Sequence, residues 1–189
     1  MTDLHWPDHL QRRLARPPGR ADPTGRHEAA VALVLAAQRY TGPLALFIKR
    51  ALHPGDPWSG QMALPGGRRD RTDDDLLATA IRETWEETGL VLTAGHVVGE
   101  LDDLAPQTPV LPPVLVRPFV FRLDDQPPLH TTHEVQSHVW FPLDELRATE
   151  RHSVVRVRGA DLTVPAYLVG GELVWGMTYR IVSSIFDEQ

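Results

Sequence analysis

Apolar residues along the chain fall into short continuous runs separated by polar, proline-rich stretches. One run covers residues 29–37 and is typical of a strand that is buried on both faces. After a turn signal at Pro43, residues 44–48 form a second run, so the two runs predict a β-hairpin. The same pattern predicts further strands at 61–64, 96–101, 114–122, 134–141, 153–157 and 162–168.

Helical patterns lie between these runs, at 3–16, at 74–88, directly after Pro142 and at 176–187. The helix over 74–88 has the clearest ends, because Thr72 or Asp73 can cap its first turn and Gly89 can end it in a left-handed conformation. This mixture of elements predicts an α/β (α+β) fold in which helices pack on a mixed sheet.

Prolines, glycines and charged residues at 17–27 predict a loop between the first helix and the rest of the chain. We therefore expect an N-terminal helix and loop extension over 1–27 and one main domain over 28–189. A length of 189 residues is that of a single domain, and its core is large enough to need no disulfide or structural metal.

Charge and composition exclude several classes of protein. A net charge of −6 and a pI near 5.8 argue against a partner that is a nucleic acid polymer. The absence of cysteine excludes disulfide scaffolds, cysteine-ligated metals and thiol nucleophiles. No apolar run approaches the ~20 residues of a membrane helix, and the first residues lack the apolar core of a signal peptide. We therefore expect no membrane partner and a cytoplasmic location.

Residues 82–90, Arg-Glu-Thr-Trp-Glu-Glu-Thr-Gly-Leu, carry the strongest chemical signal. On a helix, Glu86 and Glu87 follow Glu83 by three and four positions, so the three carboxylates share one face. No lysine is interleaved to offset their repulsion. Carboxylate oxygens suit Mg²⁺ or Mn²⁺, which keep some of their waters and bridge to substrate phosphates. Arg82 lies one turn before Glu86 and can hold that carboxylate in place.

An exposed acidic helix face is the ordinary alternative for such a cluster. The stretch before the helix favours a function, because Leu64-Pro65-Gly66-Gly67 ends a strand a short loop before it. Paired glycines allow unusual backbone angles and the close approach of a ligand or metal.

Taken together, Gly67, an acidic residue at Asp73 or Asp74, and residues 82–90 closely resemble the Nudix box, the signature of hydrolases of nucleoside diphosphates linked to another group. Counted back from Arg82, Gly67 lies one residue early, which implies one extra loop residue. The first glutamate of the signature is an aspartate here. Neither departure touches the three glutamates. The resemblance implies a Nudix α/β/α sandwich with a mixed β-sheet.

In the mechanism that this resemblance implies, Glu83, Glu86 and Glu87 bind Mg²⁺ or Mn²⁺, and the carbonyl of Gly67 completes the site. The metal lowers the pKa of a bound water, which attacks phosphorus in a small-molecule diphosphate. The expected catalytic residues are Glu86, Glu87 and Glu134, with either Glu86 or Glu134 taking the proton from that water.

Glu134 begins the strand over 134–141, and a glutamate at this place in Nudix proteins sometimes reaches the active site as a ligand or base. The alternative interpretation is that Glu134 is simply an exposed carboxylate at the start of a strand. Within the motif itself, Arg82 and Gly89 are expected to have structural roles.

The longer loop is similar to that of the coenzyme A pyrophosphatase branch. Arg50 ahead of residues 60–67, and the segment 174–178, also resemble parts of that branch. Residues 56–59, Asp-Pro-Trp-Ser, replace its usual basic residue and histidine. The resemblance favours coenzyme A or an acyl derivative as substrate. Nucleoside triphosphates, nucleotide sugars and ADP-ribose are the alternatives.

Arg50 and Trp58 are the expected substrate-binding residues. A guanidinium at the end of a strand near the glycines can take a phosphate through two hydrogen bonds, although a surface salt bridge is as good an explanation. Trp58 lies in the adjoining loop and can stack on the substrate, against the ordinary alternative of packing.

Two other classes of function are weaker. Retention of all three glutamates disfavours a catalytically silent domain that only binds a nucleotide. The absence of cysteine disfavours a Nudix-fold isoprenyl diphosphate isomerase. The oligomeric state stays open, with a homodimer as one option.

Overall fold

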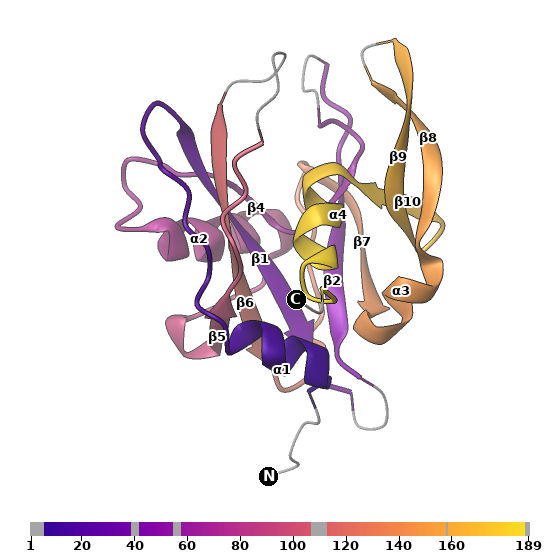
Figure 1. Ribbon diagram of the computed structural model, residues 1–189. Helices are drawn as coiled ribbons and strands as arrows, with labels where there is room; N and C mark the ends of the chain where they lie inside the picture. Colours follow the sequence, from indigo (N-terminus) through magenta and orange to yellow (C-terminus); the bar gives the residue numbers. More distant parts are fainter. Residues whose placement is uncertain (1–5, 39–41, 55–57, 107–112, 158, 188–189) are drawn as a thin grey trace.

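The structure is a computed structural model that describes residues 6–38, 42–54, 58–106, 113–157 and 159–187. Figure 1 shows its helices and strands. The helices are α1 (Asp8–Leu14), α2 (Leu76–Thr88), α3 (Leu146–Thr149) and α4 (Gly176–Ser183), with 3₁₀ turns η1 (Ala94–His96) and η2 (Leu143–Glu145). The strands are β1 (His27–Ala36), β2 (Leu44–Arg50), β3 (Met62–Ala63), β4 (Gly66–Arg68), β5 (Val97–Glu100), β6 (Val114–Leu123), β7 (Val135–Pro142), β8 (Arg151–Val157), β9 (Ala160–Val169) and β10 (Glu172–Trp175).

The main sheet is mixed, which confirms the predicted fold class. Its strands follow the order β3-β2-β1-β6-β5, while β4 pairs with β1 and β7 pairs with β2. β1 runs parallel to β6 along its whole length, and its other pairings are antiparallel. The predicted hairpin of β1 and β2 is present where Leu35 pairs with Ala45 and Ala36 pairs with Leu44. Beyond these pairs the two strands take different partners, which makes room for β4 beside β1.

β1 is buried on both faces, as its continuous apolar run predicts. Its small side chains, such as Ala30 and Ala32, belong to a cluster with Leu76 and Ala80 of α2. Small residues on this face let the helix approach the strand closely. The alternate positions, such as Leu33, belong to a larger cluster on the opposite face.

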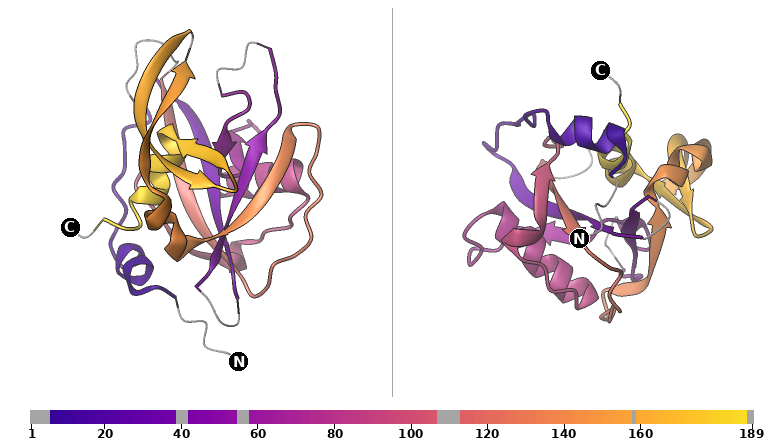
Figure 2. Two further views of the ribbon diagram at one scale, coloured as in Figure 1. Left: turned by 90° about the vertical axis from the view of Figure 1, so that its right-hand side faces the viewer. Right: turned by 90° about the horizontal axis from the view of Figure 1, so that it is seen from below.

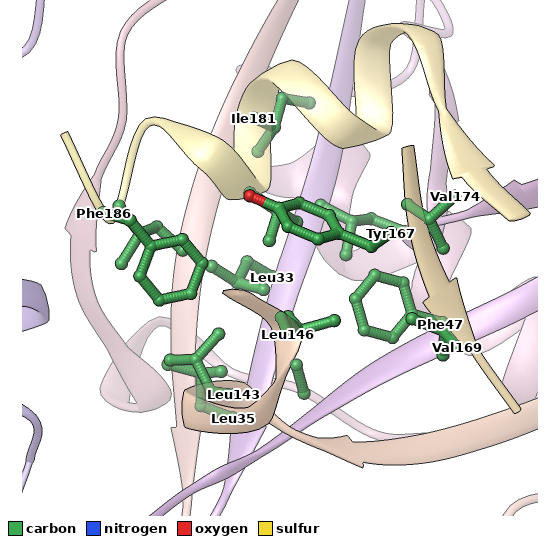
Figure 3. Packing of buried hydrophobic residues seen from close by; sticks show 14 of the residues in the cluster. Leu33, Leu35, Phe47, Leu143, Leu146, Tyr167, Val169, Val174, Ile181 and Phe186 are labelled. Carbon is green, nitrogen blue, oxygen red and sulfur yellow. The ribbon is translucent and has the colours of Figure 1, made fainter. Parts of the chain in front are cut away.

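That larger cluster lies between the main sheet and the elements that pack on this opposite face. It contains Leu10 of α1, Tyr167 of β9 and Ile181 of α4. Figure 3 shows Phe47, Tyr167 and Phe186 among the aliphatic side chains of this cluster. In the right-hand view of Figure 2, α1 and α4 lie on one side of the sheet and α2 lies on the other. This arrangement is the predicted sandwich.

Two strands were not predicted. β4 is only three residues long and begins with two glycines, so no side-chain alternation announces it. β10 pairs with β9 after the turn Gly170-Gly171, whose φ angles are +57° and +87°. Such paired glycines with positive φ are typical of a two-residue hairpin, so this strand had a signal in the sequence.

Three helices are shorter than predicted, and α2 begins at Leu76 rather than at 74. α1 begins at Asp8 rather than at residue 3, and residues 1–5 lie outside the described part. α4 ends at Ser183 rather than at 187, because tighter turns follow in which Ile185 and Phe186 donate to carbonyls three residues earlier. Among the described residues, none of the helices combines the length and apolar character needed to cross a membrane.

The N-terminal extension packs against the rest of the chain. The Leu10 side chain is fully buried, and the Arg13 guanidinium lies 2.8 Å from the Asp102 carboxylate. Asp103 accepts hydrogen bonds from Arg117 and from the backbone N–H of Ala21. The boundary between extension and main domain at residue 27 stays a prediction, but the two parts share one core.

Candidate active site

The helix that carries the three glutamates has well-defined ends. Asp75 caps it by accepting a hydrogen bond of 2.8 Å from the N–H of Ala78. The expectation of a cap at Thr72 or Asp73 was therefore wrong. The helix ends where the sequence predicts, because Gly89 is left-handed with a φ of +68° and its N–H bonds to the Trp85 carbonyl.

The glycine pair of β4 lies against this helix. Gly66 donates its N–H to Glu87 Oε2 at 2.9 Å. A Cβ on Gly67 would lie only 2.5 Å from the carboxyl carbon of Glu83. Only a residue without a side chain lets the Glu83 carboxylate lie this close to the strand, so the glycines position two of the three glutamates.

Glu87 is the buried member of the group, with 2% of the residue exposed. Burial raises the pKa of its carboxyl to about 7, while the Gly66 N–H and the Arg50 guanidinium oppose the shift. Arg50 Nη1 lies 3.7 Å from Glu87 Oε1. The register of β2 against β7 shifts between Lys49 and Arg50, and such a bulge re-aims the side chains that follow it.

Arg82 joins the acidic groups into one network. Its Nε and Nη2 each donate to a different oxygen of Asp73 at 2.9 Å. Its Nη1 donates to Glu83 Oε1 at 2.9 Å and to Glu86 Oε2 at 3.0 Å. The guanidinium holds the pKa of the Asp73 carboxyl well below its usual range. Asp73, rather than Asp74, is thus the acidic partner of Arg82.

Glu83 is half-buried beside Gly67. Burial raises the pKa of its carboxyl, Arg82 opposes this shift, and the negative charges of Glu86 and Glu134 add to it. Glu134 immediately precedes β7 and lines one cavity together with Glu86 of this helix. Its own side chain is 57% exposed.

The loop over 130–134 brings Glu134 to this place through backbone hydrogen bonds to α2 and to the end of β2. The N–H of His130 donates to the Thr88 carbonyl at 2.9 Å, and the N–H of Thr132 donates to the Glu87 carbonyl at 3.3 Å. On the other side, the Glu134 carbonyl accepts the N–H of Ala51 at 2.8 Å. The loop over 130–134 thus connects the last turn of the helix to the end of β2.

Trp58 lies in the loop between β2 and β3 and is half-buried. Its carbonyl accepts the N–H of Gln61 at 3.2 Å. In the same loop, Ser59 Oγ accepts the N–H of His53 at 2.7 Å. Residues 56 and 57, which belong to the stretch 56–59 that departs from the coenzyme A branch, lie outside the described residues.

The donor set fits a hard divalent cation. Glu83 and Glu86 are at present bridged by the cationic Arg82, which shows that both carboxylates reach one positive charge. Within the described residues, no three histidine or acidic side chains converge as a ready-made cage. Mg²⁺ does not require one, because it keeps several waters and uses one or two carboxylates together with substrate phosphates.

Comparisons with known proteins bear on the family and the fold of this chain. The NUDIX domain model matches residues 25–158. The uncharacterized Nudix hydrolase NudL of Enterobacter sp. (strain 638) is 33% identical over 193 residues, covering 97% of this chain and 94% of that protein. The human mitochondrial coenzyme A diphosphatase NUDT8 is 34% identical over 154 residues, covering 79% of this chain and 64% of that protein.

The uncharacterized protein C14C4.10c of Schizosaccharomyces pombe is 37% identical over 134 residues, covering 67% of this chain. The chain spans 41% of the length of that relative and 64% of the human one, so both relatives contain further sequence.

Solved structures show the same fold. A MutT/nudix family protein from Enterococcus faecalis superimposes with a TM-score of 0.59 and 19% identity, covering 93% of this chain and 65% of the other. The MutT protein of Methanosarcina mazei gives a TM-score of 0.51 and 18% identity, covering 71% of this chain and 85% of the other. The domain match and the full-length likeness to a NudL protein show that the chain belongs to the Nudix hydrolase family.

Proposed function

We propose that this chain is a Mg²⁺- or Mn²⁺-dependent pyrophosphohydrolase that cleaves coenzyme A or an acyl-coenzyme A at its diphosphate. One observation carries the chemistry: Glu83 and Glu87 of α2 lie against the glycine pair of β4, with Glu87 bonded to the Gly66 N–H. The substrate rests on the likeness to a human protein named as a coenzyme A diphosphatase and on the motifs around Arg50 and residues 174–178.

In this proposal, Glu83, Glu86 and Glu87 hold the cation together with the carbonyl of Gly67. A bound cation of this kind neutralises charge on the diphosphate and lowers the pKa of a water molecule. Arg82 keeps Glu83 and Glu86 on the side of the helix that faces the substrate, because one guanidinium is bonded to both carboxylates.

The base that takes the proton from the attacking water is an exposed carboxylate. Glu86 and Glu134 have side chains that are 44% and 57% exposed, so both can reach water. Glu87 is unsuited to this role, because its carboxylate is buried and bonded to Gly66. The water oxygen forms a bond to phosphorus, the bridging P–O bond breaks, and coenzyme A yields phosphopantetheine and adenosine 3′,5′-bisphosphate.

A second candidate is hydrolysis of another nucleoside diphosphate derivative, such as a nucleoside triphosphate, a nucleotide sugar or ADP-ribose. The departure of residues 56–59 from the coenzyme A branch is the observation that favours it. Both candidates use the same carboxylates and differ only in the groups attached to the diphosphate. In either case the partner is a small molecule.

The test is a substrate panel assayed with Mg²⁺ and with Mn²⁺, with the products identified by chromatography. We expect coenzyme A or an acyl derivative to have the highest kcat/KM. A value for coenzyme A a hundredfold below that of any nucleotide would overturn the substrate assignment. Glu83→Gln should abolish turnover, whereas Glu145→Gln, an exposed glutamate on η2, should not change it. Equal effects of the two substitutions would overturn the site.

A further inference from the structure

An open cavity of about 490 Å³ lies at the last turn of α2, directly beside the acidic group. Its lining includes Trp85, Glu86, Gly89, His130, Thr132 and Glu134. Two of these residues, Glu86 and Glu134, are the candidate bases of the proposed reaction. A group in this cavity would therefore lie next to the diphosphate that is cleaved.

Trp85 is largely exposed, whereas a tryptophan side chain is usually well buried. Of the five tryptophans, all of which the structure describes, it is the one that is exposed, at 56%. Its neighbours in sequence are Thr84, which is fully buried, and Glu86, which accepts a hydrogen bond from Arg82. The indole instead presents a large apolar surface to the cavity, where a flat ring could cover it.

The charges around the cavity limit what can bind there. Glu86 and Glu134 lie on its wall, and His133, which also lines it, lies 3.9 Å from the Glu134 carboxylate. A phosphate or carboxylate would be repelled by the two glutamates. A neutral flat ring that carries N–H donors suits this environment, because it can stack on the indole and donate to a carboxylate.

We propose that Trp85 and the loop over 130–134 form the subsite for the nucleobase of the substrate. This inference rests on the proposed function and adds to it the place where the base is recognised. The nucleobase stacks on the indole of Trp85, and an exocyclic amino group of the kind adenine carries donates to Glu134, which leaves Glu86 as the base of the proposed reaction. The diphosphate then extends from the cavity toward Glu83 and Gly67.

Direct binding tests the subsite without any turnover. Adenosine 5′-monophosphate and ribose 5-phosphate differ only in the base, so their dissociation constants can be compared by calorimetry. We expect Trp85→Leu to weaken adenosine monophosphate about tenfold, because the leucine keeps apolar bulk but loses the stacking face. Trp85→Phe should stay within about threefold of the wild type, and ribose 5-phosphate should bind all three proteins equally.

Val91→Ala is the matched control, since Val91 is another exposed apolar residue near the end of α2 but does not line this cavity. It should leave both dissociation constants unchanged. Equal binding of the two ligands by the wild type, or unchanged binding of adenosine monophosphate to Trp85→Leu, would overturn the subsite. A shift of Trp85→Leu from dimer to monomer with unchanged nucleotide binding would assign the residue to a subunit contact instead.

Kinetics separate the failure of this inference from the failure of the proposed function. Trp85→Leu should raise KM for coenzyme A about tenfold and leave kcat within about twofold, because stacking is alike in the ground and transition states. Against an abasic analogue of coenzyme A, the variant and the wild type should have the same KM. Absence of diphosphate cleavage by the wild type would end the proposed function, while adenosine monophosphate binding would still decide the subsite.

Discussion

The N–H of Gly66 donates to Glu87 Oε2 at 2.9 Å, which joins the glycine pair of β4 to the acidic face of α2. The oxygen that accepts this bond belongs to a carboxylate that is almost fully buried. A buried carboxylate is costly when charged, and the bond from Gly66 offsets only part of that cost. A charged Glu87 carboxylate therefore lowers the stability of the metal-free fold.

Substitution of Glu87 by glutamine should lower the activity without lowering the stability. The amide oxygen can still accept the Gly66 N–H, so the local structure is kept, but the negative charge is lost. We expect turnover to fall by about 10²-fold or more, as when a group that stabilises transition-state charge is removed. The free energy of unfolding of the metal-free protein should be equal or higher. If stability fell sharply along with activity, the three glutamates would have a structural role rather than a catalytic one.

The pH dependence of stability follows from the same carboxyl. Its folded pKa of about 7 lies above the ordinary value of 4.5, so the folded state binds the proton more tightly than the unfolded state. Stability of the metal-free protein should therefore fall as pH rises from about 4.5 to about 7, by at most about 3 kcal/mol from this group. Urea unfolding of wild type and Glu87→Gln across this range tests it, and the variant should have the flatter profile. If the stabilities of the two proteins changed with pH in parallel, the raised pKa would not belong to Glu87.

The two glycines of β4 should respond differently to alanine. At Gly66, φ is +147° and a Cβ would lie 2.3 Å from the Ala30 carbonyl oxygen, so Gly66→Ala should lower the free energy of unfolding by about 3 kcal/mol or more. At Gly67, the three atoms nearest to a Cβ all belong to the carboxylate end of the Glu83 side chain, which can move away.

The free energy of unfolding of Gly67→Ala should therefore stay within about 1 kcal/mol of the wild-type value. Its kcat should fall about 10²-fold, because the added methyl group moves the Glu83 carboxylate out of position for the reaction. Thermal melting and kcat measured on both variants check this contrast. Equal loss of stability in the two proteins would show that Gly67 is a folding residue rather than a residue that positions Glu83.

Metal removal should abolish activity reversibly. Arg82 is the cationic residue of α2 that bonds to these glutamates, at Glu83 and Glu86, and a diphosphate adds further negative charge to the site. We expect no turnover in excess chelator and recovery on addition of Mg²⁺ or Mn²⁺. Undiminished turnover in chelator would contradict the hydrolytic mechanism proposed for these residues.

Much of this site could be predicted from local sequence, because a helix fixes the relative directions of side chains three and four residues apart. That regularity places Glu83, Glu86 and Glu87 on one face and brings Arg82 to Glu86. The helix cap could not be predicted in the same way. Several consecutive residues before α2 are suitable caps, and Asp75 takes the role because Asp73 is held by Arg82, nine residues away.

Contacts between distant segments account for the other differences. β4 exists because the backbone of Gly66 and Gly67 pairs with β1, and glycines carry no pattern that would show it. The loop over 130–134 reaches α2 through hydrogen bonds donated by the backbone N–H groups of His130 and Thr132. Because almost every residue has such an N–H group, the side chains in the sequence do not indicate this contact. The cavity at Trp85 follows from that docking, so it could not be predicted from the helix alone.

Trp58 provides the final test, because it and Trp85 are expected to contact different parts of one substrate. Trp58 is half-buried in the loop after β2, and its carbonyl accepts the N–H of Gln61, whose own carbonyl accepts the N–H of Arg50. If it packs on the pantetheine arm, Trp58→Ala should raise KM for coenzyme A with kcat unchanged, since such a contact is alike in the ground and transition states. Unlike the change at Trp85, this one should raise KM equally for the abasic analogue. An effect of Trp58→Ala that disappears with the abasic analogue would instead place the base on Trp58 and leave Trp85 without its proposed role.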